Sequence, residues 1–214
     1  MLEDVAAIVF DEFHERHLAG DLGLALALDI QQQLRPDLRL LVMSATLDGE
    51  RLQRQLDARR LTSEGRSYPV EIVYFPARKD ESLVFQCKRA LENAFQQHTG
   101  DVLVFLPGRR EINALEAALA SLCSPTLSVL PLHGDLPVEQ QSRALQPAPE
   151  GTRRVVLASN VAESSVTLPG VRVVIDSGLA REPRFEPNSG FSRLDTVAIS
   201  QASADQRAGR AGRV

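Results

Sequence analysis

Two adjacent carboxylates, Asp11 and Glu12, follow an apolar run at residues 5–10. An unbroken apolar run of this length predicts a strand that is buried on both faces. Open α/β sheets gather their ligand chemistry at the carboxyl ends of the strands, where these two side chains would lie. If the strand ends there, so that both act at one site, the pair can hold a magnesium ion and orient a water molecule. The alternative is a pair of acids that caps a helix over residues 16–34 through its dipole.

A second group of chemically able residues lies in the run Gln206-Arg207-Ala208-Gly209-Arg210-Ala211-Gly212-Arg213. Gln206, Arg210 and Arg213 are predicted on one face of a helix, with Arg207 off that face and tolerant of alanine. Each glycine costs about 1 kcal/mol in a helix interior, which is tolerable if another group must approach the backbone closely. Guanidinium groups can stabilise a transferring phosphoryl group. The acidic pair and the arginines together indicate nucleotide hydrolysis. For the arginine run taken alone, the alternative interpretation is a solvated basic tail.

Glycine, hydroxyl, amide and basic residues follow several further strand candidates. Backbone amides and hydroxyls at strand-to-helix turns can grip a phosphodiester chain without reading its bases. Ordinary turns and capping residues are the alternative interpretation. These turn residues are Ser44 and Thr46, Gly108 and Arg109, His133 and Gly134, and Ser159 and Asn160.

The elements that would position these groups alternate between short apolar runs and helical patterns, which predicts an α/β fold with a parallel sheet and flanking helices. Helical spacing is found at residues 18–30, 80–97 and 109–122, and Asp48 could cap a short helix. A polar stretch at residues 63–69 marks a domain boundary. The first piece has about two strands, the second at least five, and residues 177–200 predict a β-hairpin with its turn at 186–190. The strand candidates are residues 5–10, 38–43, 70–75, 102–106, 127–132, 154–158 and 171–175.

Composition limits the function classes. With 43% hydrophobic and 24% charged residues the chain is ordinary for a globular protein, and its net charge of −4 argues against a general nucleic-acid coat. No apolar run reaches the length of a membrane span, and the start is acidic, unlike a signal peptide. Cys87 and Cys123 lack metal or redox spacing, which predicts two buried thiols in a reducing cytoplasm. Neither lysine, Lys79 or Lys88, follows a glycine, so no P-loop is encoded within these 214 residues.

The run Asp11-Glu12-Phe13-His14-Glu15-Arg16, then Ser44-Ala45-Thr46, then residues 206–213, resemble motifs II, III and VI of DEAH-type superfamily 2 helicases. Phe13, in place of the usual alanine, is most similar to the bacterial HrpB-type ATP-dependent helicases. The turns at residues 102–112 and 158–167 resemble motifs IV and V. The motifs occur in the expected order along the whole chain. Two positions depart from the pattern: Pro169 replaces an acidic residue linked to the ribose, and Leu145 replaces a phenylalanine that stacks on the base, so nucleotide choice is expected to be loose.

The resemblance implies a RecA-like fold, with residues 1–66 ending a first domain and residues 67–214 forming most of a second. It implies that the whole enzyme uses ATP or another NTP with Mg²⁺ and acts on single-stranded RNA, with DNA left open, as a cytoplasmic monomer. The phosphate-binding loop would then lie upstream, and the isolated chain would be inactive. In this family Ser44 and Thr46 would couple hydrolysis to strand separation. The residues implied to act on the nucleotide are Asp11 and Glu12 (metal and water), His14 (link to the second domain), Thr167, Gln206, Arg210 and Arg213.

Two hypotheses from other classes stay open at this point. The missing P-loop favours a non-catalytic RecA-like binding module. Asp11, His14 and His17 could alternatively form a metal-dependent hydrolase, although His14 and His17 are one residue closer than a zincin motif requires.

Overall fold

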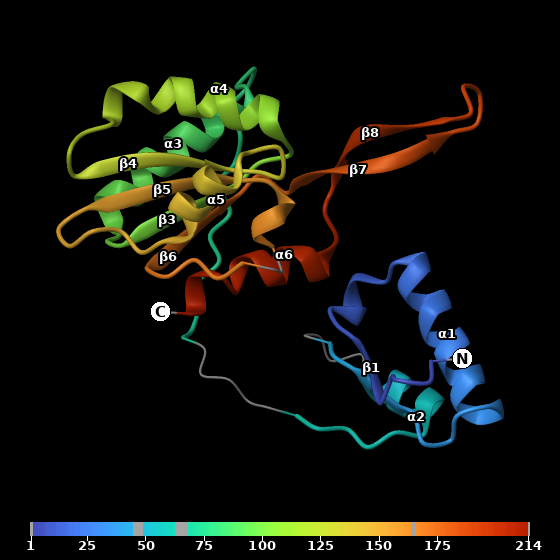
Figure 1. The fold of residues 1–214 in the computed structure, drawn as a ribbon. Coiled ribbons are helices and arrows are strands. Elements are labelled where there is room, and N and C mark those ends of the chain that lie inside the picture. Colours follow the sequence, from blue (N-terminus) through green and yellow to red (C-terminus); the bar gives the residue numbers. More distant parts are fainter. Residues whose placement is uncertain (1, 45–48, 63–67, 164–165, 214) are drawn as a thin grey trace. The chain divides into compact units, whose positions relative to one another are not determined.

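The chain divides into two compact units, residues 1–64 and 65–214. The structure, a computed structural model, describes residues 2–44, 49–62, 68–163 and 166–213 (Figure 1). The two units are described separately below. None of the helices in these ranges has the length and apolar content that crossing a bilayer would need.

The first unit is a two-stranded parallel sheet with helices. Strand β1 (Ala7–Phe10) pairs with β2 (Arg39–Val42). Helix α1 (Leu18–Gln33) connects them, a 3₁₀ turn spans Phe13–Glu15, and α2 (Gly49–Leu56) follows β2. The proposed Asp48 cap lies outside the described residues.

The prediction that residues 5–10 are buried on both faces is wrong. Burial alternates along β1, and Val9 is 52% exposed. A Cβ at Gly23 of α1 would lie 3.4 Å from the Phe10 ring, so α1 packs on the face that carries Phe10. In the described part of this unit, the face of β1 that carries Val9 is left uncovered. The apolar run is therefore only half buried.

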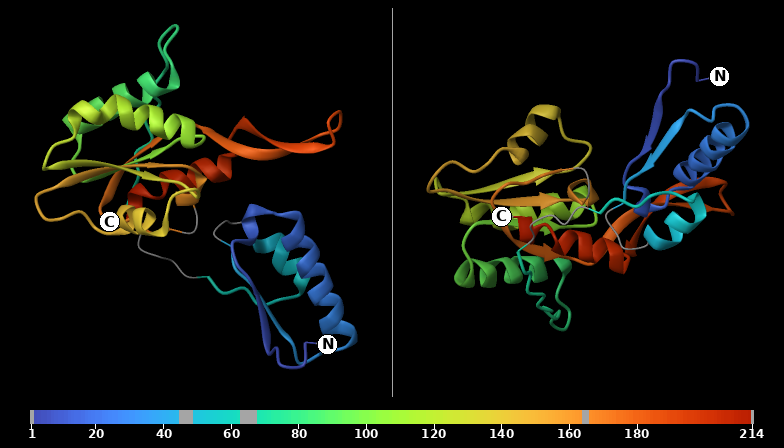
Figure 2. Two further views of the ribbon diagram at one scale, coloured as in Figure 1. Left: turned by 45° about the horizontal axis from the view of Figure 1, so that its top comes forward. Right: turned by 90° about the horizontal axis from the view of Figure 1, so that it is seen from below.

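The second unit is built on a four-stranded parallel sheet in the order β4-β5-β3-β6. Helices α3 and α4 pack on one face, and α5 lies on the other (Figures 1 and 2). This confirms the predicted α/β class. The bounds are α3 Leu83–Gln97, β3 Asp101–Phe105, α4 Arg109–Leu119, a 3₁₀ turn Ala120–Leu122, β4 Leu127–Leu132, α5 Val138–Leu145, β5 Arg153–Ala158, a 3₁₀ turn Asn160–Ala162 and β6 Val171–Asp176.

The core forms two layers because side chains alternate along the central strands. Val102 and Val104 of β3 face the helices α3 and α4, where they meet Leu91 and Leu115. Leu103 and Phe105 face the other way, toward the cluster that includes Ala144 of α5. All five residues of β3 are buried, as expected for a strand with neighbours on both edges and helices on both faces.

Residues 70–75 do not form the predicted strand. They are extended but join no ladder within the described residues, and Ile72, Val73 and Tyr74 are 61%, 73% and 90% exposed. Alternating apolar residues favour a strand only where a neighbouring backbone is available to pair with them. Within the described residues, the other four strand candidates of the second unit form the parallel sheet, and the hairpin adds two further strands.

The predicted hairpin is confirmed. Strand β7 (Leu179–Glu186) pairs antiparallel with β8 (Phe191–Ala198), and the hairpin extends away from the parallel sheet (Figure 2). Gly190 closes the turn at φ +71°, a left-handed conformation that favours glycine. Helix α6 (Gln201–Ala208) follows, and a 3₁₀ turn spans Ala211–Arg213.

A buried ion pair joins the amino ends of β3 and β5. Arg154 is 2% exposed, and its Nε lies 2.5 Å from Asp101 Oδ2. The same guanidinium donates to the carbonyls of Ala144, Gln146 and Pro169. One side chain thus ties α5 and the loop before β6 to the sheet.

The two cysteines differ, although both were predicted to be buried. Cys87 is buried within the α3 side of the core, whereas Cys123 is exposed where the 3₁₀ turn ends at the surface. Burial, with a smaller contribution from the charge of Asp176, raises the pKa of Cys87 to about 11. Because the thiolate is the reactive form, Cys87 is protected twice, by burial and by protonation.

We therefore expect iodoacetamide at mildly alkaline pH to alkylate Cys123 at least about tenfold faster than Cys87. Mass spectrometry of timed samples measures the two rates. A Cys123→Ser variant should lose the fast phase, and denaturant should make the remaining cysteine reactive. Equal rates in the folded protein would contradict the burial of Cys87.

Candidate nucleotide and nucleic-acid site

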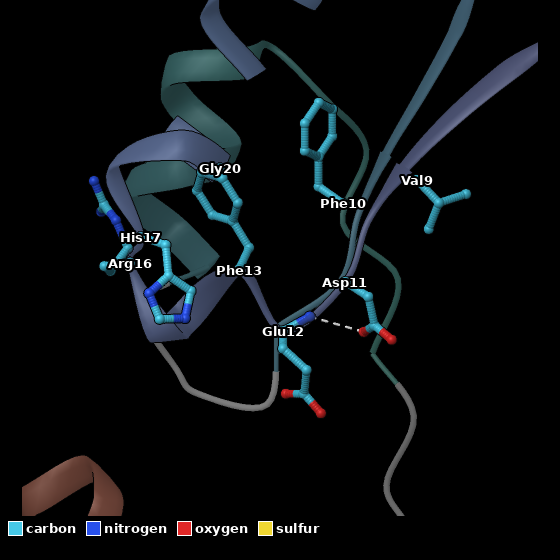
Figure 3. Close-up of a pocket in the computed structure, with 8 residues that line it drawn as sticks. All are labelled: Val9, Phe10, Asp11, Glu12, Phe13, Arg16, His17 and Gly20. Atoms are coloured by element: carbon cyan, nitrogen blue, oxygen red, sulfur yellow. Dashed lines mark hydrogen bonds between the residues drawn. The ribbon is translucent and has the colours of Figure 1, made fainter. Parts of the chain in front are cut away.

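The acidic pair lies where the first strand ends. Strand β1 stops at Phe10, and Glu12 takes the left-handed conformation with φ 50° before the 3₁₀ turn. Asp11 Oδ1 accepts a hydrogen bond from the Glu12 amide at 2.8 Å (Figure 3). His14 Nε2 lies 3.4 Å from Glu12 Oε2, and the His14 side chain is only 6% exposed. Strand β1 thus ends immediately before Asp11, which is the condition under which both carboxylates could act at one site.

A pocket of about 240 Å³ opens beside this turn. Figure 3 shows the Asp11 and Glu12 side chains at the end of the strand, joined by the hydrogen bond from the Glu12 amide to Asp11 Oδ1. Carboxylates of this kind fit Mg²⁺, which nucleotide sites hold through one or two acids together with phosphate oxygens and water. The lining residues are Val9, Phe10, Asp11, Glu12, Phe13, Arg16, His17 and Gly20.

The end of β2 lies against the same turn. The Met43 amide donates to the Phe10 carbonyl at 2.8 Å, and the Phe13 amide donates to the Met43 carbonyl at 3.0 Å. Ser44, which follows Met43, is exposed beside the acidic turn. Thr46 lies outside the described residues.

The alternative metal hydrolase on Asp11, His14 and His17 gains no support. In the ranges that the structure describes, no three His, Cys, Asp or Glu side chains gather to hold a metal. His17 is exposed at the N-cap of α1, whereas His14 is turned toward Glu12.

In the second unit, the turns after β3, β4 and β5 meet at one edge of the sheet. The register places Phe105 and Leu132 on either side of Ala158, and the Ser159 amide donates to the Leu132 carbonyl at 3.2 Å. The residues predicted to bind nucleic acid follow these neighbouring strand ends: Gly108, Arg109, His133, Gly134, Ser159 and Asn160.

These six residues differ in accessibility. Arg109, Gly134 and Asn160 are exposed, whereas Gly108, His133 and Ser159 are buried. The Nδ1 atom of His133 has no hydrogen-bond partner among the described residues. The edge therefore offers both exposed donors and a buried ring nitrogen.

The predicted single helix through Gln206, Arg210 and Arg213 is wrong. Helix α6 ends at Ala208, Gly209 is its C-cap, and residues 211–213 form a separate 3₁₀ turn. The helix ends here because Arg210 is anchored elsewhere: its guanidinium donates to the Val166 carbonyl at 2.5 Å and to the Glu163 carbonyl. Arg210 is 4% exposed, and Gln206 is half-buried on α6.

One glycine of this run, Gly212, does serve a close approach. A Cβ at Gly212 would lie 2.8 Å from the Tyr68 carbonyl oxygen, and the Tyr68 amide donates to the Gly212 carbonyl at 2.9 Å. The group that approaches is therefore the backbone of the chain itself.

Arg207, which was predicted to tolerate alanine better than Arg210, occupies a buried site that the helical spacing did not indicate. Arg207 is 1% exposed and forms ion pairs with Glu163 and Asp176, both at 2.9 Å. Its partners are distant in sequence, so no local pattern could have identified it.

The segment after β5 faces this arginine cluster. Thr167, predicted to contact nucleotide, is exposed and follows Val166, whose carbonyl is bonded to Arg210. Leu145 is half-buried against the α5 side of the core. The Pro169 carbonyl accepts from Arg154.

Comparison with known proteins identifies the fold. The family model described as "Helicase conserved C-terminal domain" matches residues 86–214. The chain belongs to this helicase family. ATP-dependent RNA helicase HrpB of Escherichia coli is 48% identical over 214 residues, which is all of this chain and 26% of that protein. ATP-dependent RNA helicase DEAH11 of Arabidopsis thaliana is 42% identical over 222 residues, 99% of this chain and 12% of that protein.

The helicase fold agrees in three dimensions as well. A crystal structure of the E. coli DEAH/RHA helicase HrpB matches all of this chain with a TM-score of 0.91 at 48% identity, covering 27% of that chain. The resemblance to HrpB-type DEAH helicases is thus confirmed. The chain spans about a quarter of the length of HrpB.

Proposed function

We propose that this chain acts as part of an ATP-dependent RNA helicase that couples NTP hydrolysis to movement along, or remodelling of, single-stranded RNA. The observation that carries the proposal is the carboxyl edge of the parallel sheet in the second unit. There the turns after β3, β4 and β5 meet, in a chain 48% identical throughout to an RNA helicase. Residues 1–66 would be the end of a first RecA-like domain, and residues 67–214 most of a second.

Nucleotide chemistry is assigned to the acidic turn and the terminal arginines. Asp11 would hold Mg²⁺ with help from Glu12, and a bound Mg²⁺ would neutralise charge on the phosphates. Glu12 would accept a proton from the attacking water, and its contact with His14 at 3.4 Å would restrain the carboxylate. Gln206 would place that water, and Arg210 and Arg213 would stabilise charge on the transferring group. Thr167 would contact the nucleotide, and Ser44 and Thr46 would couple hydrolysis to strand separation.

RNA binding is assigned to the sheet edge in the second unit. Arg109 and Asn160 are exposed there and would contact phosphates, with the buried Gly108, His133 and Ser159 shaping the surface beneath and Gly134 allowing close approach. Contacts of this kind hold a backbone without reading sequence. DNA remains a second substrate to test. We expect a monomer that works in the cytoplasm.

A non-catalytic RecA-like binding module is the second candidate. The observation that favours it is the absence of a Gly-x-x-x-x-Gly-Lys motif from the 214 residues. Without such a loop there are no amides or lysine to hold the β- and γ-phosphates.

A comparison of two proteins tests both candidates. The first is this chain, and the second, called the extended protein, continues upstream through a Gly-Lys-Ser/Thr phosphate-binding loop. We expect no RNA-stimulated NTPase activity from the chain alone and clear stimulation in the extended protein, abolished by Glu12→Gln. A steady-state phosphate-release assay with and without single-stranded RNA measures it. Turnover by the 214-residue chain that Glu12→Gln removes would contradict the proposal, and an inactive extended protein that binds RNA would favour the module.

A further inference from the structure

Arg207 occupies the junction of three elements that follow the sheet edge. Its Nε donates to Glu163 Oε2 and its Nη1 to Asp176 Oδ1, each at 2.9 Å, and Nη1 also approaches the Leu179 carbonyl at 3.3 Å. Glu163 lies after β5, Asp176 ends β6, and Leu179 begins the hairpin strand β7. One side chain of α6 therefore holds the segment after β5, the end of β6 and the base of the hairpin.

The guanidinium is also fixed from the sheet side. Its carbon lies 4.7 Å from the centre of the Phe105 ring, at the carboxyl end of β3. Stacking of this kind and two carboxylates restrain a planar guanidinium more than they could restrain an ammonium, which has no plane and no fork of donors.

Glu163 is held by three residues of the α6 region. Arg207 and the Ser203 hydroxyl both bond its carboxylate, and Arg210 donates to its backbone carbonyl. Arg210 also bonds the carbonyl of Val166. The position of Arg210 and the position of the segment after β5 are therefore set by one shared residue.

We propose that Arg207 is a positioning residue for the reaction: through Glu163 it fixes the segment that carries Ser159, Asn160 and Thr167 relative to Arg210. This inference rests on the proposed function, in which Ser159 and Asn160 contact RNA and Arg210 contacts the nucleotide. Arg207 is assigned no ligand contact, because its Nε and Nη1 already bond Glu163, Asp176 and the Leu179 carbonyl. Its effect is to keep the RNA contacts and the nucleotide contact at a fixed distance and orientation. Binding of RNA at Ser159 and Asn160 is thereby coupled to the placement of Arg210.

A matched pair of lysine variants of the extended protein tests this role. Arg207→Lys keeps the charge but loses the fork that joins Glu163 to Asp176. Arg154→Lys makes the same change at a second buried arginine, which is paired with Asp101 at the amino ends of β3 and β5, the opposite end of the sheet from Ser159 and Asn160. The measurement is kcat at saturating nucleotide and RNA, at a temperature where circular dichroism shows each variant folded.

We expect Arg207→Lys to lower kcat about 10- to 100-fold, because small displacements of contacting groups have effects of that size. Arg154→Lys should lower the melting temperature and leave kcat per folded molecule within about twofold. Ser203→Ala, which removes one contact to Glu163 and keeps Arg207, should lower kcat in the same direction by a smaller factor, and it serves if Arg207→Lys does not fold.

A double variant separates positioning from general stability. If Arg207 acts through Glu163, the two substitutions should not be additive. The fold-reduction in kcat of the double variant Arg207→Lys with Glu163→Gln should be far smaller than the product of the two single fold-reductions. A normal kcat in folded Arg207→Lys, or equal effects of Arg207→Lys and Arg154→Lys, would overturn the inference. If the unsubstituted extended protein shows no RNA-stimulated hydrolysis, the proposed function fails instead.

Discussion

Replacement of Arg210 by alanine in the extended protein is expected to lower the turnover rate by about 10³- to 10⁵-fold, the range for loss of an arginine finger. The guanidinium would act on charge that develops in the transition state, so the loss should fall on kcat rather than on RNA affinity. The structure adds a second reason. Two carbonyls, of Glu163 and Val166, accept hydrogen bonds from Arg210, and alanine would leave both without this donor.

The measurement is single-turnover hydrolysis at saturating nucleotide, with RNA affinity measured at fixed salt. Arg210→Lys should recover little activity. A planar guanidinium can bond two carbonyls and a phosphate at once, and an ammonium has no such planar fork of donors. Arg193→Ala is a suitable control, since this hairpin arginine is 66% exposed. Normal turnover together with weakened RNA binding in Arg210→Ala would show that the assignment of this arginine to the nucleotide is wrong.

Replacement of Arg154 by alanine is expected to lower the free energy of unfolding of the second unit by about 3–5 kcal/mol, the usual effect of removing one partner from a buried ion pair. Asp101 would keep its charge in a buried site, where it is 4% exposed. Three carbonyls that accept from the guanidinium would lose a donor at the same time.

Urea unfolding followed by circular dichroism measures this change in the 214-residue chain. Arg143→Ala, an exposed position on α5, should change stability by less than about 0.5 kcal/mol. Adding Asp101→Asn to Arg154→Ala should recover part of the loss, because the uncompensated charge is removed. If Arg154→Ala were no worse than Arg143→Ala, the ion pair would not be a determinant of this fold.

The sheet of the second unit could be predicted because its strands satisfy local and tertiary rules at once. The run at residues 102–106 is apolar throughout, and the folded strand Asp101–Phe105 has neighbours on both edges and helices on both faces. Residues 70–75 are also mostly apolar and yet join no ladder in the part of the chain that the structure describes. The difference is the presence of a neighbouring strand, which a single segment of sequence does not encode.

The candidate site was predictable in its residue types but not in its internal contacts. Asp11 and the turn residues could be located because each follows an apolar strand pattern. The helical spacing of Gln206 and Arg210 was misleading, since the hydrogen bonds of Arg210 to Glu163 and Val166 outweigh the continuation of the helix. The role of Arg207 depends on partners 44 and 31 residues away, which spacing arguments cannot reach.

The contact between Gly212 and Tyr68 has a consequence for how the second unit could be handled as a module. The Tyr68 amide nitrogen lies 2.9 Å from the Gly212 carbonyl oxygen, so two segments far apart in the sequence lie side by side, as is common where domains tolerate transplantation or circular permutation. A side chain at position 212 would force these two strands of backbone apart. The absence of a side chain at Gly212 therefore lets the backbone segments around residues 68 and 212 pack directly against each other.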